Sequence, residues 1–335
     1  MSRLARLAAF APWAVLFLAC GPHTQIRATS AGTVSTTTGS SVTGQTLTER
    51  PVEAPQAWLW RISGGDAAAP SYVLGTMHVG IRLPDALPHP YDDYLAQARV
   101  LVMEVDLREA ERFFREQGEH APRRRVRPLD RQLGRESWAR LVAEVDGHVP
   151  EAVLRQAPPV LISLYLQQVY LAAVEAAAEG REPIPGVPST ARLDETIFQN
   201  CITDGCSFVA LETPEQAMVP FEGTGVESDA LAQLRALVDD RAEAIDQMAA
   251  LRSAYLAFDE IAILQAIGQG MTPALHDALF LQRNRAWEAA LLPQIQRGNA
   301  FVAVGLGHLL GGGSVLEALA QHGYTVERLG EPPTE

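Results

Sequence analysis

Four ionisable side chains that could form a reactive centre each follow a short apolar run of the chain. They are His78, Glu104, Glu212 and His308. Asp106 comes two residues after Glu104, so we expect it on the same face of an extended chain. Two imidazoles with one or two carboxylates form a ligand set for a divalent transition metal that keeps open positions for water. Such a metal acidifies its bound water, which is the basis of metal-assisted hydrolysis.

Each of these residues also has an ordinary structural interpretation. A single histidine after a strand is commonly a hydrogen-bonded structural residue. Glu104 and Asp106 could simply form a polar strand exit, and Glu212 or Thr213 could cap a helix that starts at Pro214. No single residue is decisive, and only the recurrence of the pattern after four separate apolar runs indicates a site.

The elements that must position these residues follow from the hydrophobic pattern. Continuous apolar runs such as Val100–Met103 are typical of strands covered on both faces. Helical patterns fill the gaps, including 228–269 and 273–297, with Thr272 as an N-cap and Pro273 at the first helical position. The predicted strands are 58–62, 72–77, 100–105, 207–211, 301–304 and 324–328.

This order of elements predicts an α/β fold with a mostly parallel or mixed central sheet flanked by helices. The helix-rich stretches 108–190 and 215–297 are predicted to be large insertions that cover the sheet. In open sheets of this kind, ligands bind beyond the carboxyl ends of the strands. The four ionisable residues fall at such strand ends, which predicts that they meet at one edge of the sheet.

Both histidines close a Gly-x-x-His sequence, formed by residues 75–78 and 305–308. The glycine-rich run 305–311 superficially resembles a dinucleotide-binding fingerprint, but its spacing is wrong. Only 24 residues follow Gly311, too few for the rest of such a binding unit. We interpret the glycines as allowing a close approach of the backbone to the site. Ser314 lacks the second glycine of a nucleophile elbow.

Composition excludes several classes of function. The chain has 335 residues and 47% hydrophobic content, enough for a sizeable core. Its formal net charge of −13 argues against nucleic acid as a partner. Every basic residue is arginine, and the absence of lysine excludes Schiff-base, phosphate-loop and serine–lysine chemistry.

The N-terminus has the pattern of a targeting segment. Arg3 and Arg6 precede an apolar run that is too short to span a bilayer comfortably. The run ends in Phe-Leu-Ala-Cys-Gly at residues 17–21, which resembles the lipobox of bacterial lipoproteins, with Phe17 in place of the usual leucine. Cys20 would then carry the lipid anchor. Ordinary secretory cleavage, with Cys20 as a bystander, is the alternative.

These features predict three regions: a lipoprotein signal peptide at 1–20, a flexible Ser/Thr/Gly-rich tether at 21–55, and an α/β domain at 56–330. The expected location is the bacterial cell envelope, with the protein anchored to the inner or outer membrane. Cys201 and Cys206 could form a local disulfide in this oxidising compartment, or remain two buried thiols.

At these residues the chain resembles the TraB/GumN family, also called the TraB/PrgY/GumN or Tiki-like group. The resemblance spans roughly residues 57–329 and keeps the family's order of motifs. The matching segments are 72–80, 102–106, 193–195, 211–216, 283–284, 301–309 and 323–326.

The resemblance implies a Tiki-like or erythromycin-esterase-like fold, and in the animal branch a membrane-tethered, metal-dependent protease. Carried over, His78 and His308 become metal ligands or catalytic bases, and Glu104 a ligand or general base. Arg283 would hold a carboxylate or a developing oxyanion, supported by Asn284. The alternative for Arg283 is a structural ion pair with Glu212 or Asp106.

Three functions are compatible with this sequence. The first is a hydrolase dependent on Mn²⁺, Co²⁺ or Zn²⁺ that acts on peptides or proteins outside a bacterial membrane. The second is a non-enzymatic lipoprotein that binds a peptide signal, as pheromone-shutdown members of the family suggest. The third is a metal-free esterase that uses a histidine base.

Overall fold

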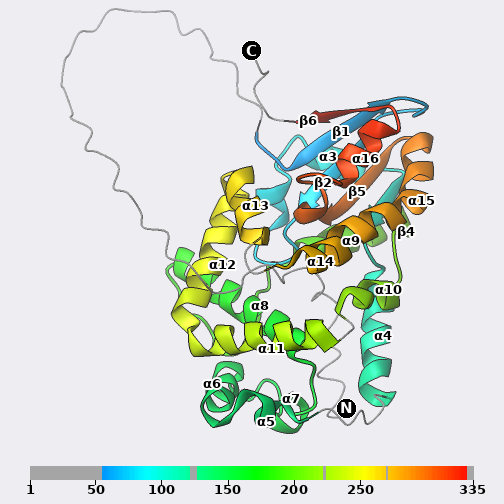
Figure 1. Cartoon of the computed structure of the whole chain (residues 1–335). Coiled ribbons are helices and arrows are strands. Elements are labelled where there is room, and N and C mark those ends of the chain that lie inside the picture. Colours follow the sequence, from blue (N-terminus) through cyan, green and yellow to red (C-terminus); the bar gives the residue numbers. More distant parts are fainter. Residues whose placement is uncertain (1–54, 121–126, 222–223, 269–270, 330–335) are drawn as a thin grey trace, which may run out of the picture.

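The computed structural model describes residues 55–120, 127–221, 224–268 and 271–329. The predicted signal peptide, Cys20 and almost all of the predicted tether lie outside the described residues. The described part contains a six-stranded sheet in the order β4-β3-β5-β2-β1-β6 (Figure 1). The strands are β1 (Leu59–Gly64), β2 (Ser71–Thr76), β3 (Val100–Met103), β4 (Ser207–Ala210), β5 (Ala300–Gly305) and β6 (Tyr324–Arg328).

The sheet is mixed, as predicted. Its four strands β4, β3, β5 and β2 are parallel neighbours, whereas β1 pairs antiparallel with both β2 and β6. The burial of each strand explains its place. All residues of β3 and β5 are buried, so these uniformly apolar strands lie in the middle of the sheet. Exposed and buried residues alternate in β6, which forms one edge.

The predicted strand positions are confirmed to within two residues at each end. One difference matters for the site: β3 ends at Met103, not at Val105. Asp106 therefore lies outside the strand, and the alternation of faces along a strand no longer applies to it.

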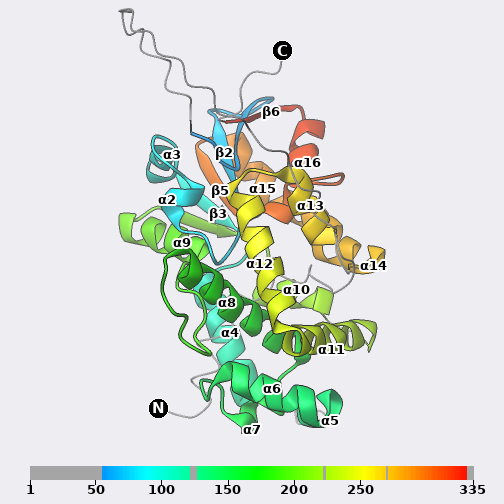
Figure 2. The same cartoon turned by 90° about the vertical axis from the view of Figure 1, so that its left-hand side faces the viewer.

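The helices divide into two groups (Figures 1 and 2). Some lie close to the sheet, and the others form a separate helical layer beyond the carboxyl ends of the parallel strands. The helices near the sheet are α2 (Leu83–Ala86), α3 (Asp92–Ala96), α9 (Leu193–Asp204), α15 (Gln282–Arg297) and α16 (Val315–Gln321). The helical layer contains α5 (Leu129–Leu133), α6 (Arg135–Val145), α7 (Glu151–Leu154), α8 (Pro159–Ala178), α11 (Thr224–Asp239) and α12 (Arg241–Leu256).

The remaining elements connect the two groups. They are α4 (Leu107–His120), α10 (Pro214–Met218), α13 (Glu260–Gly268), α14 (Pro273–His276) and the 3₁₀ turns Val219–Phe221 and Leu306–His308. Helix α12 also ties the layer directly to β2, because the Tyr255 hydroxyl donates to the carbonyl of Gly75 at 2.8 Å.

The predicted helix over 273–297 is present, with Thr272 as its N-cap as predicted. It contains one irregular turn that the sequence did not indicate. Residues Asp277–Leu281 form a π-helical turn between α14 and α15. Such turns are rare and occur preferentially at functional sites. This one lies immediately before Arg283.

Helix α8 is long and apolar enough to cross a membrane, and within the described residues it is the one helix of that kind. Two thirds of its most apolar stretch, 67%, is buried by the rest of the protein, as expected for a core helix.

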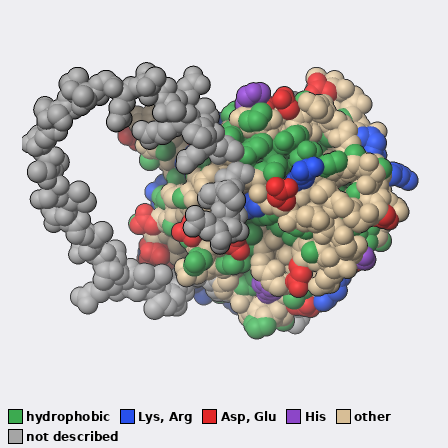
Figure 3. Space-filling model, turned by 90° about the horizontal axis from the view of Figure 1, so that it is seen from above, with side chains coloured by type: hydrophobic (Ala, Val, Ile, Leu, Met, Phe, Trp, Pro, Cys, Tyr) green, Lys and Arg blue, Asp and Glu red, His purple; other side chains and the backbone are tan. Residues whose placement is uncertain are grey.

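The face of the molecule seen from above has apolar side chains near its centre, with acidic and basic side chains interspersed around them (Figure 3).

Candidate active site

The parallel strands end level with one another, which brings their following residues together. Thr76 at the end of β2 pairs with Gly305 of β5, and Met103 of β3 pairs with Ala303 of β5. The pairing of β3 and β4 continues past both strands, because the Glu212 amide donates to the carbonyl of Glu104 at 2.9 Å. His78, Glu104, Glu212 and His308 therefore leave the same edge of the sheet.

Arg283 joins three of these four residues. Its Nε and Nη2 donate to both carboxylate oxygens of Glu212, and Nη2 also donates to Glu104 Oε2 at 2.8 Å. Its Nη1 donates to the carbonyl of Leu279 at 3.2 Å and to His308 Nε2 at 3.1 Å. All five N–H donors of the guanidinium are thus used within the protein. In this arrangement Arg283 therefore has no free donor for the predicted role of holding a substrate carboxylate or an oxyanion.

The predicted alternative for Arg283, an ion pair with Glu212, is present. The predicted pair with Asp106 is not. Asp106 instead accepts from the backbone amide of Arg108 at 2.8 Å and forms an ion pair with the Arg108 side chain at the start of α4. Within the described residues, no contact links Asp106 to the cluster, so we remove it from the candidate site.

The tautomer of His308 follows from Asn284. The Asn284 side-chain nitrogen donates to two carbonyls, those of Gly313 at 2.8 Å and His308 at 3.4 Å, so its oxygen faces His308. That oxygen lies 2.6 Å from His308 Nδ1, which must carry a proton to donate. His308 Nε2 then accepts from Arg283. Both ring nitrogens of His308 are occupied, and Asn284 serves to position the ring.

His78 has a different partner. Its Nδ1 hydrogen-bonds the carboxylate of Asp194, a buried residue in the first turn of α9. The backbone secures this approach, because the amide of Leu193 donates to the carbonyl of His78 at 3.1 Å. A histidine whose Nδ1 is bonded to a carboxylate presents Nε2 for chemistry or for metal binding.

Glu104 lies between the two histidines. Its Oε1 is 3.9 Å from His78 Nε2 and 4.0 Å from His308 Nε2. The same oxygen accepts from the backbone amide of Gly305 at 2.7 Å, and Oε2 accepts from Arg283. The carboxylate is therefore held at both oxygens, one of which faces both rings.

The two histidines titrate in opposite directions. Burial lowers the pKa of His78, but the Asp194 carboxylate and then Glu104 outweigh that effect, so the net shift is upward. Burial, the Arg283 guanidinium and His78 all lower the pKa of His308 well below its ordinary value. Burial raises the pKa of Glu104, an effect that Arg283 and His78 oppose. The Arg283 donor at Nε2 and the lowered pKa both favour the neutral form of His308, whereas the Asp194 carboxylate favours protonation of His78.

Gly75 of the first motif packs against the second motif, and Gly307 within the second motif packs against Phe280. A Cβ at Gly75 would lie 2.5 Å from Leu306 Cδ1, inside the second motif. A Cβ at Gly307 would lie 2.7 Å from the ring of Phe280, whose centroid is 5.0 Å from that of His308. The close approach of the backbone that was predicted for the run 305–311 is observed at Gly307, and Gly75 shows a similar close packing that was not predicted.

Sequence reasoning missed two members of the cluster. Asp194 lies 116 positions from His78, and although it falls in the family-matching segment 193–195, no role was assigned to it. Trp287 follows Arg283 by one helical turn, and its indole N–H donates to Glu212 Oε2 at 3.0 Å. Its ring also packs against that of His308 in a tilted arrangement, with centroids 4.3 Å apart. Both side chains complete the hydrogen bonding of predicted site residues.

Cys201 and Cys206 are joined by a disulfide. The bond connects the last turn of α9 to the residue before β4. It therefore links the helix that carries Asp194 to the strand that leads to Glu212.

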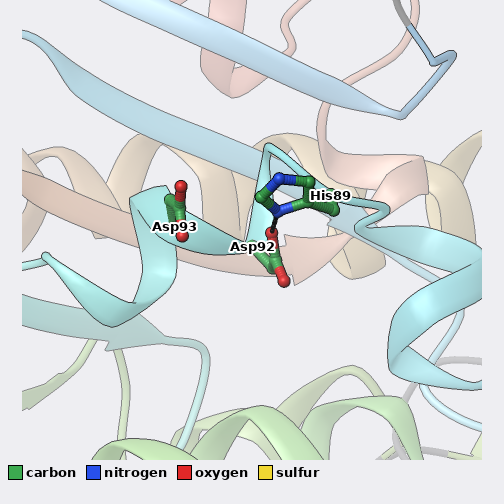
Figure 4. A group of neighbouring side chains, drawn as sticks. All are labelled: His89, Asp92 and Asp93. Atoms are coloured by element: carbon green, nitrogen blue, oxygen red, sulfur yellow. Dashed lines mark hydrogen bonds and ion pairs between the residues drawn. The ribbon is translucent and has the colours of Figure 1, made fainter.

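A second group of possible metal ligands lies apart from this cluster. His89, Asp92 and Asp93 are exposed beside α3, and His89 Nδ1 lies 3.1 Å from Asp92 Oδ1 (Figure 4). Their ligand atoms lie within 4.8 Å of one another. Exposed acidic groups of this kind are common on protein surfaces, and we assign no function to this one.

Comparison with known proteins gives one match. The model of the TraB/PrgY/gumN family matches residues 58–328, from the start of β1 to the end of β6. No curated protein and no solved structure matches the chain.

Proposed function

The chain belongs to the TraB/PrgY/gumN family, and from that premise we propose that it is a hydrolase whose reactive groups are His78 and Glu104. The observation that carries the proposal is the distance of 3.9 Å between His78 Nε2 and Glu104 Oε1. It is too long for a hydrogen bond, and a single water oxygen or cation could contact both atoms. Around this pair, Asp194, Arg283 and the neutral His308 act as positioning residues.

The relative burial of the two histidines supports this division of roles. His308 is 0% exposed and has both ring nitrogens occupied, whereas His78 retains 7% exposure. Both ring nitrogens of His308 are thus engaged within the protein, whereas the Nδ1 bond to Asp194 fixes the orientation of the His78 ring.

We further propose a divalent cation as cofactor, and the donor chemistry of the site fits it in part. His78 and Glu104 offer an imidazole and a carboxylate at a suitable spacing. The buried cluster also has three carboxyl groups, those of Glu104, Asp194 and Glu212, against one guanidinium, and this excess of acidic groups favours a cation. His308, the third predicted ligand, does not fit while its Nε2 accepts from Arg283.

Held by His78 and Glu104, such a cation would polarise a substrate carbonyl and lower the pKa of bound water. The protein's own contribution is orientation. Asp194 fixes the imidazole, and Gly305 and Arg283 fix the carboxylate. Arg283 also stabilises the negative charge of Glu104 and Glu212 in a site largely closed to solvent.

A metal-free hydrolase is the second candidate, and the Asp194–His78 pair favours it. His78 Nε2 would take a proton from an attacking water, and Asp194 would stabilise the resulting imidazolium. In this form Glu104 would act as a second electrostatic partner of the protonated ring. The same residues serve both candidates, and only the dependence on metal differs.

For the substrate and location we propose peptides or proteins at the outer face of a bacterial membrane. The lipobox-like sequence ending at Cys20 supports anchoring, and the disulfide between Cys201 and Cys206 is compatible with an oxidising compartment. The family's pheromone-shutdown members make a peptide the most economical substrate class to test first.

The deciding experiment measures metal binding and peptide cleavage together. Purified protein is titrated with Mn²⁺, Co²⁺ and Zn²⁺ while its melting temperature is followed, and cleavage of a defined peptide mixture is analysed by mass spectrometry. We expect one metal to raise the melting temperature, and His78→Ala to abolish both the shift and cleavage. His89→Ala, in the exposed group, is the matched control and should change neither.

Two other results would redirect the assignment. Cleavage that persists in EDTA would identify the metal-free hydrolase. Retention of peptides without cleavage, under every metal condition, would instead indicate a signal-binding lipoprotein.

A further inference from the structure

Three polar side chains in the helical layer are buried with unpartnered polar atoms. They are Ser163 and Gln167 on α8 and Gln233 on α11. Gln167 is 1% exposed, and neither its amide nitrogen nor its oxygen has a hydrogen-bond partner among the described residues. The same holds for both amide atoms of Gln233. Burying an amide in this state is unfavourable, so stability alone would favour an apolar residue at each position.

Gln167 interrupts an apolar stripe along one face of α8. Val160, Leu164 and Leu171 are all buried, and together with Gln167 they follow the spacing i, i+4, i+7 and i+11. Gln167 is thus the polar member of a face that otherwise packs as core.

The two ends of this stripe lie near residues that adjoin the two histidine motifs. Leu164 packs in one apolar cluster with Phe280, whose ring lies against His308 at a centroid distance of 5.0 Å. Leu171 Cδ2 lies 3.1 Å from the position of a Cβ at Gly80, two residues after His78. Gln167 lies between these contacts along the helix. Its face of α8 is therefore directed toward the edge of the sheet that carries both histidines.

Helix α11 brings Gln233 to the same region. Ala230 of α11 packs in the apolar cluster that contains the first half of the α8 stripe. Further along both helices, the Tyr170 hydroxyl donates to the carbonyl of Leu237 at 2.9 Å. Gln233 lies between these two anchors on α11, and Gln167 lies between the matching anchors on α8. The two carboxamides thus occupy the same level of the helix pair.

We propose that Gln167 and Gln233, with Ser163 beside them, form a recognition site for a peptide group of the substrate. A carboxamide offers a carbonyl acceptor and two N–H donors. A peptide group requires an acceptor for its N–H and a donor for its carbonyl, which two carboxamides supply together. This inference rests on the proposed hydrolase function and specifies its substrate class as a backbone amide.

The test uses the smallest probe that contains one peptide group. Protein labelled with ¹⁵N-glutamine is titrated with N-methylacetamide, and the side-chain amide signals are followed by NMR. Methyl acetate, which has no N–H, is the matched control ligand. Gln168, also buried on α8 but turned by about 100°, is the internal control signal and the site of a control variant.

We expect the signals of Gln167 and Gln233 to shift with N-methylacetamide and not with methyl acetate, while Gln168 stays in place. Gln167→Met should weaken the response of Gln233 about tenfold, as expected for the loss of a buried hydrogen bond, and Gln168→Met should leave it unchanged. Gln167→Met is also expected to raise the melting temperature, since it removes an unpaired buried amide.

The inference is overturned if Gln167 and Gln233 respond no more than Gln168, or respond equally to methyl acetate. Because the titration needs neither metal nor turnover, it is independent of the test of the proposed function. Amide binding in a protein that never cleaves peptides would support the recognition site and remove the hydrolase.

Discussion

The two Gly-x-x-His motifs are alike in sequence and in backbone position, yet their histidines have opposite surroundings. Both follow neighbouring parallel strands, β2 and β5, whose ends pair directly. His78 meets a carboxylate, whereas His308 meets a neutral amide and a guanidinium. The pKa of His78 is raised by Asp194 despite its burial, and burial and Arg283 lower the pKa of His308.

The motif therefore sets the position of each histidine in the fold, whereas the residues that contact the ring set its pKa and its hydrogen bonds. A repeated motif suggests two equivalent ligands, but the two rings have different partners, and that of His78 is a carboxylate. His308 instead completes the hydrogen bonding that holds Arg283, which in turn holds Glu104 and Glu212. The histidine of the second motif therefore helps to position Glu104, which lies beside the histidine of the first motif.

The largest effect is expected from replacing Arg283, which separates the surroundings of the two histidines. Arg283→Met leaves two buried carboxylates without their counter-charge and should destabilise the protein by about 3–5 kcal/mol in chemical denaturation. It should also raise the pKa of His308 toward that of His78. Arg285→Met, on the same helix with a side chain 65% exposed, should cost less than about 0.5 kcal/mol. Equal losses in the two variants would contradict the central role of Arg283.

Exchanging the charges of the two partners should make the histidines resemble each other. Asn284→Asp places a carboxylate oxygen against the carbonyl of Gly313, where the amide nitrogen now donates at 2.8 Å. We expect a loss of about 2–3 kcal/mol and a higher pKa for His308.

Asp194→Asn, the reciprocal change, keeps an acceptor for His78 Nδ1 and should cost only about 1 kcal/mol while lowering the pKa of His78. Thermal unfolding and NMR titration of both variants measure this asymmetry. A larger loss for Asp194→Asn than for Asn284→Asp would show that we have assigned the partners' roles the wrong way round.

A smaller effect than that of Arg283→Met should follow from crowding the contact between the two motifs. Gly75→Ala places a methyl group against Leu306 Cδ1, the flexible end of a side chain, so we expect a loss on the order of 1–2 kcal/mol. Gly312→Ala, where no atom lies within 4 Å of the new Cβ, should stay within about 0.5 kcal/mol of wild type. Denaturation curves recorded side by side test the difference.

The finest test changes no residue. Histidine-selective NMR should find that His78 binds its proton at a higher pH than His308, and that His308 keeps its proton on Nδ1. In the unfolded chain both titrate near about pH 6.5. Below that pH the unfolded chain protonates His308 and the folded protein does not, so His308 reduces stability as pH falls.

His78 has the opposite linkage, because its stabilising contribution is present below its unfolded pKa and is lost as pH rises through its folded pKa. Comparing His308→Gln and His78→Gln over the acid range separates the two effects. Parallel titration of both rings would contradict the proposed division of roles.

The sequence determined the α/β fold class and the edge of the sheet at which the candidate residues gather. Uniformly apolar runs predicted the buried strands, and the residues after them predicted one reactive edge. These features are local, because side-chain periodicity and strand burial are written in consecutive residues. The same local logic failed at Asp106, because it depended on the strand continuing two residues beyond its actual end.

Only the tertiary structure decided which partners surround each candidate residue. Asp194, which raises the pKa of His78, lies 116 positions away, and Arg283 lies 179 positions from Glu104. Such distant partners decide whether the donors of Arg283 are already used in hydrogen bonds. They also decide which ring nitrogen of each histidine carries a proton and which carboxylate has a counter-charge. Two motifs with the same local sequence therefore carry different chemistry, because pKa and hydrogen bonding are set by the groups that folding brings together.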